Sequence, residues 1–105
     1  MNYNAPMEIG IEISLYPLAE RFAPVIHDFI ARVNAAGDLK VVSGSLSTQI
    51  FGEYERVFET LRRELRATLE RQGSHGGKAA FVLKVLGPLG PAEAPRPHRR
   101  RREET

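Results

Sequence analysis

The order in which strand-like and helix-like hydrophobic spacings follow one another constrains this chain more than any other feature of its sequence. Residues 7–16 alternate between apolar side chains and polar or small ones, which predicts a strand with one covered face. Residues 22–33 then carry an apolar stripe with helical spacing. Pro24 stands where a first helical turn accepts proline, and Gly37 follows the end, as expected of a C-cap. The chain is therefore predicted to begin with a strand and a helix.

The second half of the chain is predicted to hold a hairpin, a second helix and a last strand. Residues 39–42 and 45–51 read as short strands joined by a turn at Ser43 and Gly44. Residues 54–69 have the apolar spacing of an amphipathic helix, and residues 73–77 predict a glycine-rich loop. Residues 79–86 are apolar at nearly every position, which predicts a central strand or one covered on both faces.

The resulting order, β-α-β-β-α-β, predicts an α+β, ferredoxin-like fold over residues 1–89. In that fold a four-stranded antiparallel sheet carries two helices on one face. Residues 90–105 are rich in proline and arginine, and they are predicted to form a disordered tail. The length of 105 residues suits a single domain.

Composition and charge argue against several classes of protein. The absence of cysteine excludes disulfides, thiolate zinc sites and cysteine nucleophiles. The net charge of +2 is supplied by residues 88–105 alone, which leaves a neutral body with no sign of nucleic-acid binding. The first residues lack the basic region of a signal peptide, and no apolar stretch approaches the roughly 18 residues of a membrane helix. We therefore expect a cytoplasmic protein that binds neither nucleic acid nor membrane.

Catalytic and metal-binding patterns find no support in the sequence. The three histidines, at 27, 75 and 98, have no second ligand at metal spacing, and neither a GxSxG elbow nor a phosphate-binding glycine loop occurs. RNA-recognition domains share the order of elements, but the third strand here lacks their basic and aromatic pattern. The sequence thus predicts no enzyme, no catalytic residue, no metal and no cofactor.

The alternation along the strands assigns side chains to the two faces of the predicted sheet. On the second and third strands, the side chains expected under the helices are Leu39, Val41, Leu46, Thr48 and Ile50. Thr48 is the polar exception, and leaving its hydroxyl unpaired would cost about 1–3 kcal/mol. Its partner is expected to be either a nearby backbone carbonyl or a bound ligand.

The opposite face of the sheet would expose an apolar strip of Ala80, Val82 and Leu86 in a monomer. Such strips usually mark an interaction surface, and two sheets packed face to face would cover it. A homodimer or homotetramer formed through this open face is therefore expected. The alternative is a solvent-exposed face that tolerates a few apolar side chains.

Three segments of the chain closely resemble the thiamine-binding YkoF-like family. They are IEISLYPL (11–18), SLSTQIFGEYERVFETLRREL (45–65) and GKAAFVLKVL (77–86), and the resemblance runs over about residues 7–89. It implies a ferredoxin-like fold, sheet-to-sheet assembly, and binding of thiamine or its hydroxymethylpyrimidine half. It also implies a role in the uptake, salvage or sensing of thiamine precursors.

The side chains available for such a ligand combine polar groups with flat rings. An aminopyrimidine needs hydroxyl or amide partners and an aromatic wall, and a thiazolium cation gains from ring faces and carboxylates. The candidate ligand-binding residues are Ser14, Tyr16, Ser47, Thr48, Gln49, Phe51, Glu53 and Tyr54, with Glu12 as a further carboxylate.

The sequence does not decide where the pocket lies, because Thr48 is predicted to face the helices while Ser47 and Gln49 face away from them. A pocket under the helices favours Thr48 and Tyr54. A pocket between subunits favours the serines, Tyr16 and Gln49. Two other functions are also compatible with the sequence: a structural or regulatory oligomerisation module, and an amino-acid-sensing domain of the kind usually fused to an enzyme.

Overall fold

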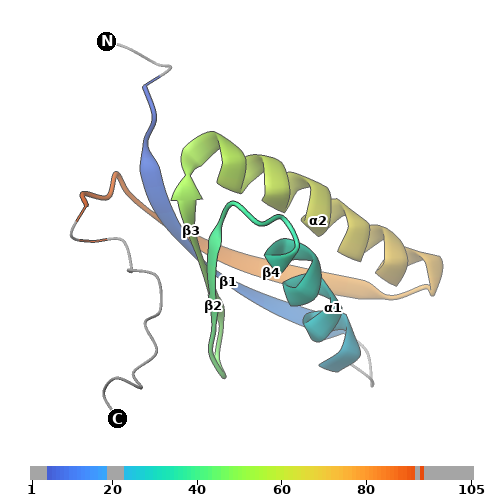
Figure 1. Cartoon of the computed structure of the whole chain (residues 1–105). Helices are drawn as coiled ribbons and strands as arrows, with labels where there is room; N and C mark the ends of the chain where they lie inside the picture. Colours follow the sequence, from blue (N-terminus) through green and yellow to red (C-terminus); the bar gives the residue numbers. More distant parts are fainter. Residues whose placement is uncertain (1–4, 19–22, 92, 94–105) are drawn as a thin grey trace.

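The computed structural model describes residues 5–18, 23–91 and 93, which contain six elements of secondary structure (Figure 1). Their bounds are β1 Glu8–Leu18, α1 Ala23–Asn34, β2 Lys40–Ser43, β3 Thr48–Glu53, α2 Tyr54–Ser74 and β4 Lys78–Leu86. This order is the predicted one. Of the predicted tail, residues 92 and 94–105 lie outside the described part of the chain.

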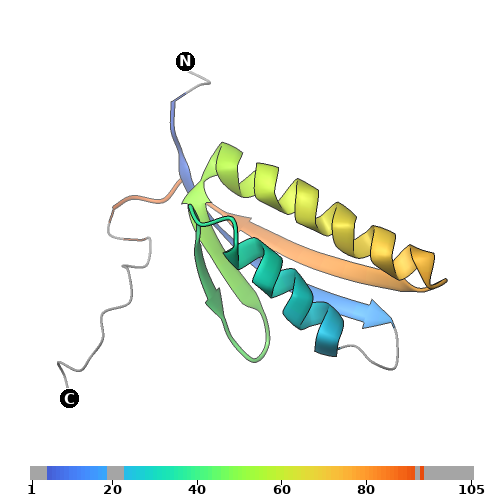
Figure 2. The same ribbon diagram turned by 45° about the vertical axis from the view of Figure 1, so that its right-hand side comes forward.

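The four strands form one antiparallel sheet in the order β2-β3-β1-β4, and both helices lie on the same face of it (Figures 1 and 2). The predicted ferredoxin-like α+β fold is confirmed. β4 is an edge strand, however, so the prediction of a central strand was wrong. Its apolar run has a different cause: Phe81 and Leu83 pack against the core, while Val82 and Leu86 are exposed on the opposite face. No described element covers that second face, which we call the open sheet face.

The core lies between the sheet and the helices. Ile9, Ile11 and Ile13 of β1 are almost completely buried, as their alternation with polar residues predicts. The other buried core residues are Phe29, Val33, Ile50, Val57 and Leu61. The Phe29 ring from α1 tilts against Phe81 of β4 with a centroid separation of 5.2 Å. One face of β1 is thus covered by both helices.

The ends of the helices follow local chemistry. Gly37 has a φ of +85°, which confirms its expected place after α1. Glu53 caps α2, accepting a hydrogen bond from the Arg56 backbone N–H at 3.2 Å. α2 continues to Ser74, so the loop predicted at residues 73–77 is shorter. Gly73 is tolerated in the last helical turn, and the chain reverses at Gly76, whose φ is +75°.

A polar network fastens α1 to α2. The Arg32 guanidinium donates to Glu64 Oε1 at 3.2 Å and to Thr68 Oγ1, and both acceptors belong to α2. Asp28, one turn before Arg32, also accepts from Arg71 of α2. Glu64 and Thr68 are buried, so these groups depend on one another for hydrogen bonds. The network fixes the position of α1 over the sheet.

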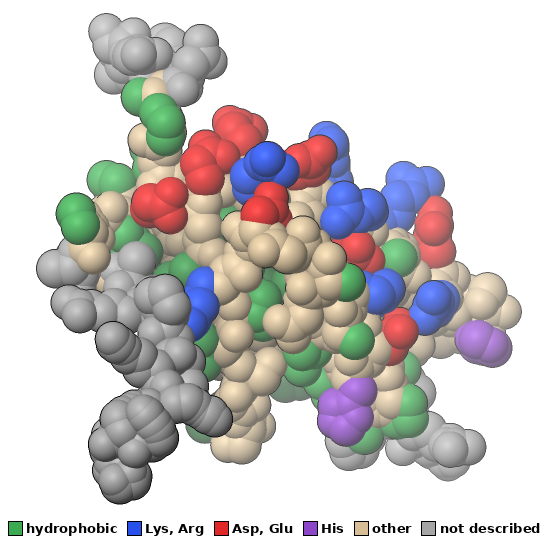
Figure 3. Space-filling view, viewed as in Figure 1, with side chains coloured by type: hydrophobic (Ala, Val, Ile, Leu, Met, Phe, Trp, Pro, Cys, Tyr) green, Lys and Arg blue, Asp and Glu red, His purple; other side chains and the backbone are tan. Residues whose placement is uncertain are grey.

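Within the described residues, no helix is both long and apolar enough to cross a membrane. Acidic and basic side chains are interspersed over α2 (Figure 3). His27 is exposed on α1, as expected of a helix-surface residue, and His75 lies just after α2.

Candidate functional site

The hairpin of β2 and β3 ends before the sheet does, and this leaves a gap beside β1. β1 pairs with β3 only as far as Ile13 and Thr48, whereas it pairs with β4 as far as Leu18 and Lys78. Residues 14–18 of β1 therefore have a strand on one side only. The third strand was predicted to begin at residue 45, but residues 44–47 form the hairpin loop, closed by a hydrogen bond from the Gly44 N–H to the Ser47 carbonyl at 2.9 Å.

This loop corrects a second prediction. Leu46 was expected on the face covered by the helices, but its side chain is 90% exposed. Strand alternation does not apply in the loop, so Leu46 and Ser47 are not forced onto opposite faces of the sheet. Ser47 and Thr48 still lie on opposite sides, as the sequence predicts, because Ser47 bonds to Glu12 of the open sheet face and Thr48 is buried opposite Ile13.

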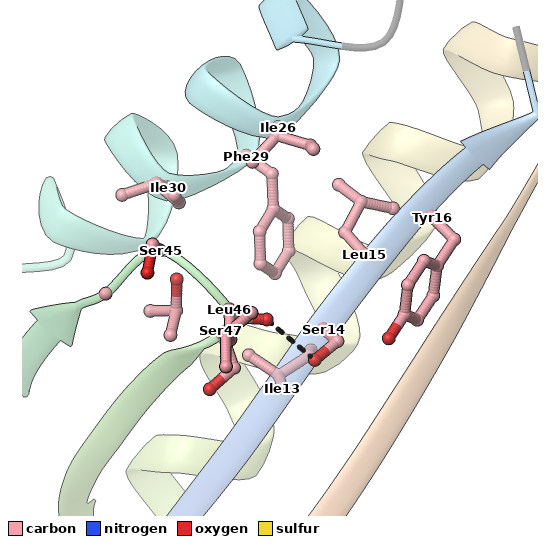
Figure 4. Close-up of a pocket in the computed structure, with 12 residues that line it drawn as sticks. Ile13, Ser14, Leu15, Tyr16, Ile26, Phe29, Ile30, Ser45, Leu46 and Ser47 are labelled. Carbon is pink, nitrogen blue, oxygen red and sulfur yellow. Dashed lines mark hydrogen bonds between the residues drawn. The ribbon is translucent and has the colours of Figure 1, made fainter.

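A pocket with a cavity volume of about 110 Å³ fills the gap between β1, α1 and the 44–47 loop (Figure 4). α1 contributes Ile26, Phe29 and Ile30, with the Phe29 ring reaching down towards β1. β1 and the loop contribute side chains of both faces of the sheet: Ile13 and Leu15 from the helix side, and Ser14 and Tyr16 from the open sheet face. The pocket thus lies under α1 and is lined by residues from both faces of the sheet.

Four of the eight predicted ligand-binding residues meet in this pocket: Ser14, Tyr16, Ser47 and Thr48. They supply three hydroxyl groups and one phenol ring around an apolar interior. The Thr48 Oγ1 lies 3.4 Å from Ser43 Oγ, and the Ser14 hydroxyl donates to the Leu46 carbonyl at 3.4 Å. Both contacts are at the long end of the hydrogen-bond range, so these hydroxyls retain capacity for a stronger partner.

The other four predicted residues do not line the pocket. Gln49 is exposed on the open sheet face opposite Glu12 of β1. The Phe51 ring lies against Gly10, where an added Cβ would come within 2.8 Å of its Cε1. Glu53 is the cap of α2, and Tyr54 packs on Phe58 with a ring-centroid distance of 4.8 Å. These three aromatic or charged side chains have local structural partners.

Glu12 connects the pocket to the open sheet face. Ser47 Oγ donates to Glu12 Oε2 at 3.0 Å, and Lys84 Nζ lies 3.2 Å from Glu12 Oε1. The hydrogen bond from Ser47 and, next, that from Lys84 hold the pKa of the Glu12 carboxyl below its usual value of 4.5. Because the Ser47 hydroxyl already donates its hydrogen bond to Glu12, its oxygen is left to act as an acceptor towards a ligand.

We expect the Glu12 carboxyl to titrate below 4.5 and its pKa to rise in Ser47→Ala. A carboxyl with a lowered pKa stabilises the fold above the pKa of the unfolded chain, and that stabilisation is lost as the pH falls through the lower folded pKa. Carboxyl-resolved NMR titration measures the shift. Ser45→Ala, in the same loop, is the matched control and should leave the Glu12 pKa unchanged. An equal pKa in wild type and Ser47→Ala would contradict the role of this hydrogen bond.

The model of the YKOF-related family matches residues 8–77, which is two thirds of the chain. This chain belongs to the YkoF-related family. The matched region of the YkoF-related chain contains β1, α1, the hairpin and α2, and therefore every residue that lines the pocket. A search of curated proteins found no match to the YkoF-related chain.

Solved structures share the fold of this YkoF-related protein. A candidate thiamine biosynthesis/salvage protein of Thermotoga maritima superposes with a TM-score of 0.68 at 18% identity, over 84% of this chain and 89% of that chain. A hypothetical protein of Methanocaldococcus jannascii gives 0.62 at 14% identity, over 84% and 88%. A domain of unknown function from Bacillus cereus gives 0.62 at 18% identity, over 79% of each chain.

The apolar wall of the pocket was not predicted from the YkoF-related sequence. Ile26, Phe29 and Ile30 belong to the helical stripe that the periodicity assigns to the core, and nothing in the local pattern marks them as pocket residues. They border the pocket because the hairpin stops short of them, although Phe29 itself is almost completely buried. In the described part of the chain, no cluster of three or more His, Cys, Asp or Glu side chains could hold a metal ion.

Proposed function

We propose that this protein binds a thiamine-like molecule through its aminopyrimidine ring and performs no chemistry on it. The observation that carries this proposal is the meeting of Ser14, Ser47 and Thr48 hydroxyls with the Phe29 and Tyr16 rings in one pocket. A flat heteroaromatic ring with donors and acceptors at its edge matches that combination of apolar wall and few polar groups. Membership of the YkoF-related family and the fold shared with a candidate thiamine biosynthesis/salvage protein support the same ligand.

The size of the pocket suits one ring and not a whole thiamine molecule. Its volume of about 110 Å³ is smaller than the ~150 Å³ of an engineered cavity that holds benzene, but the pocket has an open mouth. We therefore place the pyrimidine inside and the rest of the ligand at the mouth. There the Glu12 carboxylate, which also pairs with Lys84, offers a neighbour of opposite charge to a thiazolium cation.

The arrangement supports binding and not catalysis. Of the three hydroxyls, that of Ser47 bonds to a carboxylate of lowered pKa, which is a weak general base near neutral pH. A protein that binds a thiamine precursor without converting it can serve its uptake, salvage or sensing. We propose that it does so as a homodimer or homotetramer assembled through the open sheet face.

Calorimetric titration of the purified full chain with thiamine, and separately with hydroxymethylpyrimidine, tests this proposal. Both ligands should bind. Thr48→Val should weaken binding about tenfold, because a hydroxyl hydrogen bond to the ligand is lost. Thr60→Val is the matched control, since Thr60 is also buried but lies on α2 outside the pocket. Absence of heat with either ligand at millimolar concentration, for a folded protein, would contradict the proposed function.

A second candidate function is an oligomerisation module that holds no small molecule. The exposed apolar residues of the open sheet face favour it, because they need a partner surface but no ligand. Self-association with no response to thiamine or hydroxymethylpyrimidine would support this candidate over the first.

A further inference from the structure

We infer that the ligand and a second copy of this chain bind cooperatively, because the open sheet face of the second copy closes the mouth of the pocket. This inference rests on the proposed function, since it concerns the same pocket. It adds a coupling between ligand binding and the association of two copies, which a pocket within one subunit does not require. The partner that covers the open sheet face is another copy of this chain.

Three residues that line the pocket present their side chains on the open sheet face. Ser14 and Tyr16 of β1 pair with Val82 and Ala80 of β4, and directly opposed residues of an antiparallel pair project to the same side. Ser47 reaches the same side, where it bonds to Glu12. A protein surface laid on this face would therefore contact the pocket residues and any ligand atoms that project from the mouth.

In a single subunit, the open sheet face exposes apolar side chains to solvent. Val82 is 53% exposed and Leu86 is 66% exposed, and both lie along the middle and end of β4. The Tyr16 ring continues this apolar surface across β1 to the pocket mouth. Lys84 interrupts the apolar row between Val82 and Leu86, but Val82 lies directly opposite Ser14 of the pocket. Burial of this part of the face therefore links the energy of association to the site of the ligand.

The charges on this face are arranged so that two copies complement each other. At one end, the exposed Glu8 of β1 lies opposite Glu53 of β3, whose carboxylate is engaged as the cap of α2. At the other end, β4 begins with Lys78, opposite Leu18. Two sheets packed face to face with their strands running in opposite directions would bring Lys78 of each copy towards Glu8 of the other. The pair of Glu12 and Lys84 between these ends is already neutral.

Coupling of this kind is reciprocal. If a second copy tightens the binding of the ligand by some factor, the ligand must tighten the association of the copies by the same factor. Closure of the mouth removes water from the ring and from its hydroxyl partners, so we expect a factor within the usual range of about 5–150. A pocket that is complete in one subunit would give a factor of one.

Sedimentation of the full chain at a series of concentrations, with and without 1 mM thiamine, measures the association. We expect the dissociation constant of the dimer to fall at least fivefold with thiamine. Val82→Glu places a carboxylate on the open sheet face, in the middle of edge strand β4, and should give a monomer that binds thiamine at least fivefold more weakly by calorimetry. Leu69→Glu, an exposed apolar position on α2, is the matched control and should retain both properties.

The outcomes separate this inference from the proposed function. A monomeric Val82→Glu that binds thiamine as tightly as wild type would overturn the coupling and leave the proposed function intact. A wild-type dimer that binds neither thiamine nor hydroxymethylpyrimidine would overturn both. A wild type that stays monomeric at 100 µM with thiamine, or a Val82→Glu that still associates, would also overturn the coupling. If Val82→Glu fails to fold by circular dichroism, Leu86→Arg replaces it with the same expectations.

Discussion

Replacing Ile26 by tryptophan is expected to abolish ligand binding while the fold is kept. Ile26 is only partly buried on α1 and lines the roof of the pocket, so an indole ring in its place would occupy the volume that the pyrimidine needs. Because the pocket is empty space with an open mouth, the larger ring does not have to displace core side chains. We expect the affinity for thiamine to fall at least 30-fold, which corresponds to about 2 kcal/mol.

Calorimetry gives the affinity of Ile26→Trp, and thermal unfolding shows whether the fold is kept. The midpoint of unfolding should equal that of wild type or exceed it. Leu69→Trp is the matched control, because the same ring is added to a helix surface away from the pocket. Tight thiamine binding by a folded Ile26→Trp would show that the ligand lies elsewhere.

Replacing Arg32 by methionine is expected to destabilise the protein by about 2–3 kcal/mol. Methionine keeps the length of the side chain and its packing, but it removes the donors to Glu64 and Thr68. The side chains of Arg32 and Glu64 are only 20% and 10% exposed, so water cannot replace the lost partner fully. Arg63 remains near Glu64 and limits the loss.

Urea unfolding of Arg32→Met measures the change, with Arg66→Met as its matched control. Arg66 pairs with Glu70 on the same helix, but these side chains are 79% and 63% exposed. Exposed pairs of this type contribute little, so Arg66→Met should change the free energy of unfolding by less than about 0.5 kcal/mol. Equal losses in the two variants would show that the network is not responsible for holding α1 on α2.

Much of the fold could be predicted because hydrophobic spacing reports directly on covered faces. The alternation in β1 and the helical stripe of α1 each describe one element and its buried side, and neither depends on distant residues. The start of β3 could not be predicted in this way. Serine and threonine at 45–48 fit a strand or a turn equally well, and the hydrogen bond between Gly44 and Ser47 decides for the turn.

The candidate site also has residues that could be predicted from the sequence and residues that could not. Ser14, Tyr16, Ser47 and Thr48 could be predicted because a ligand with donors and acceptors needs side chains of these types. The apolar wall from α1 could not, since a residue in a helical stripe becomes a pocket residue only where the neighbouring element ends early. Phe51 and Tyr54 were expected to supply the aromatic wall, but each has a local packing partner, Gly10 and Phe58 respectively.

The single-sided pairing of residues 14–18 of β1 has a consequence for how such a pocket can persist through evolution. Along residues 14–16, the main-chain N–H and C=O groups that point away from β4 have no described strand beside them, and these residues line the pocket. Peptide groups are present whatever side chains a chain carries, and only a change to proline, as at Pro17, removes an N–H. A ring that is held partly by the backbone can keep its place while the residues around it are exchanged one after another.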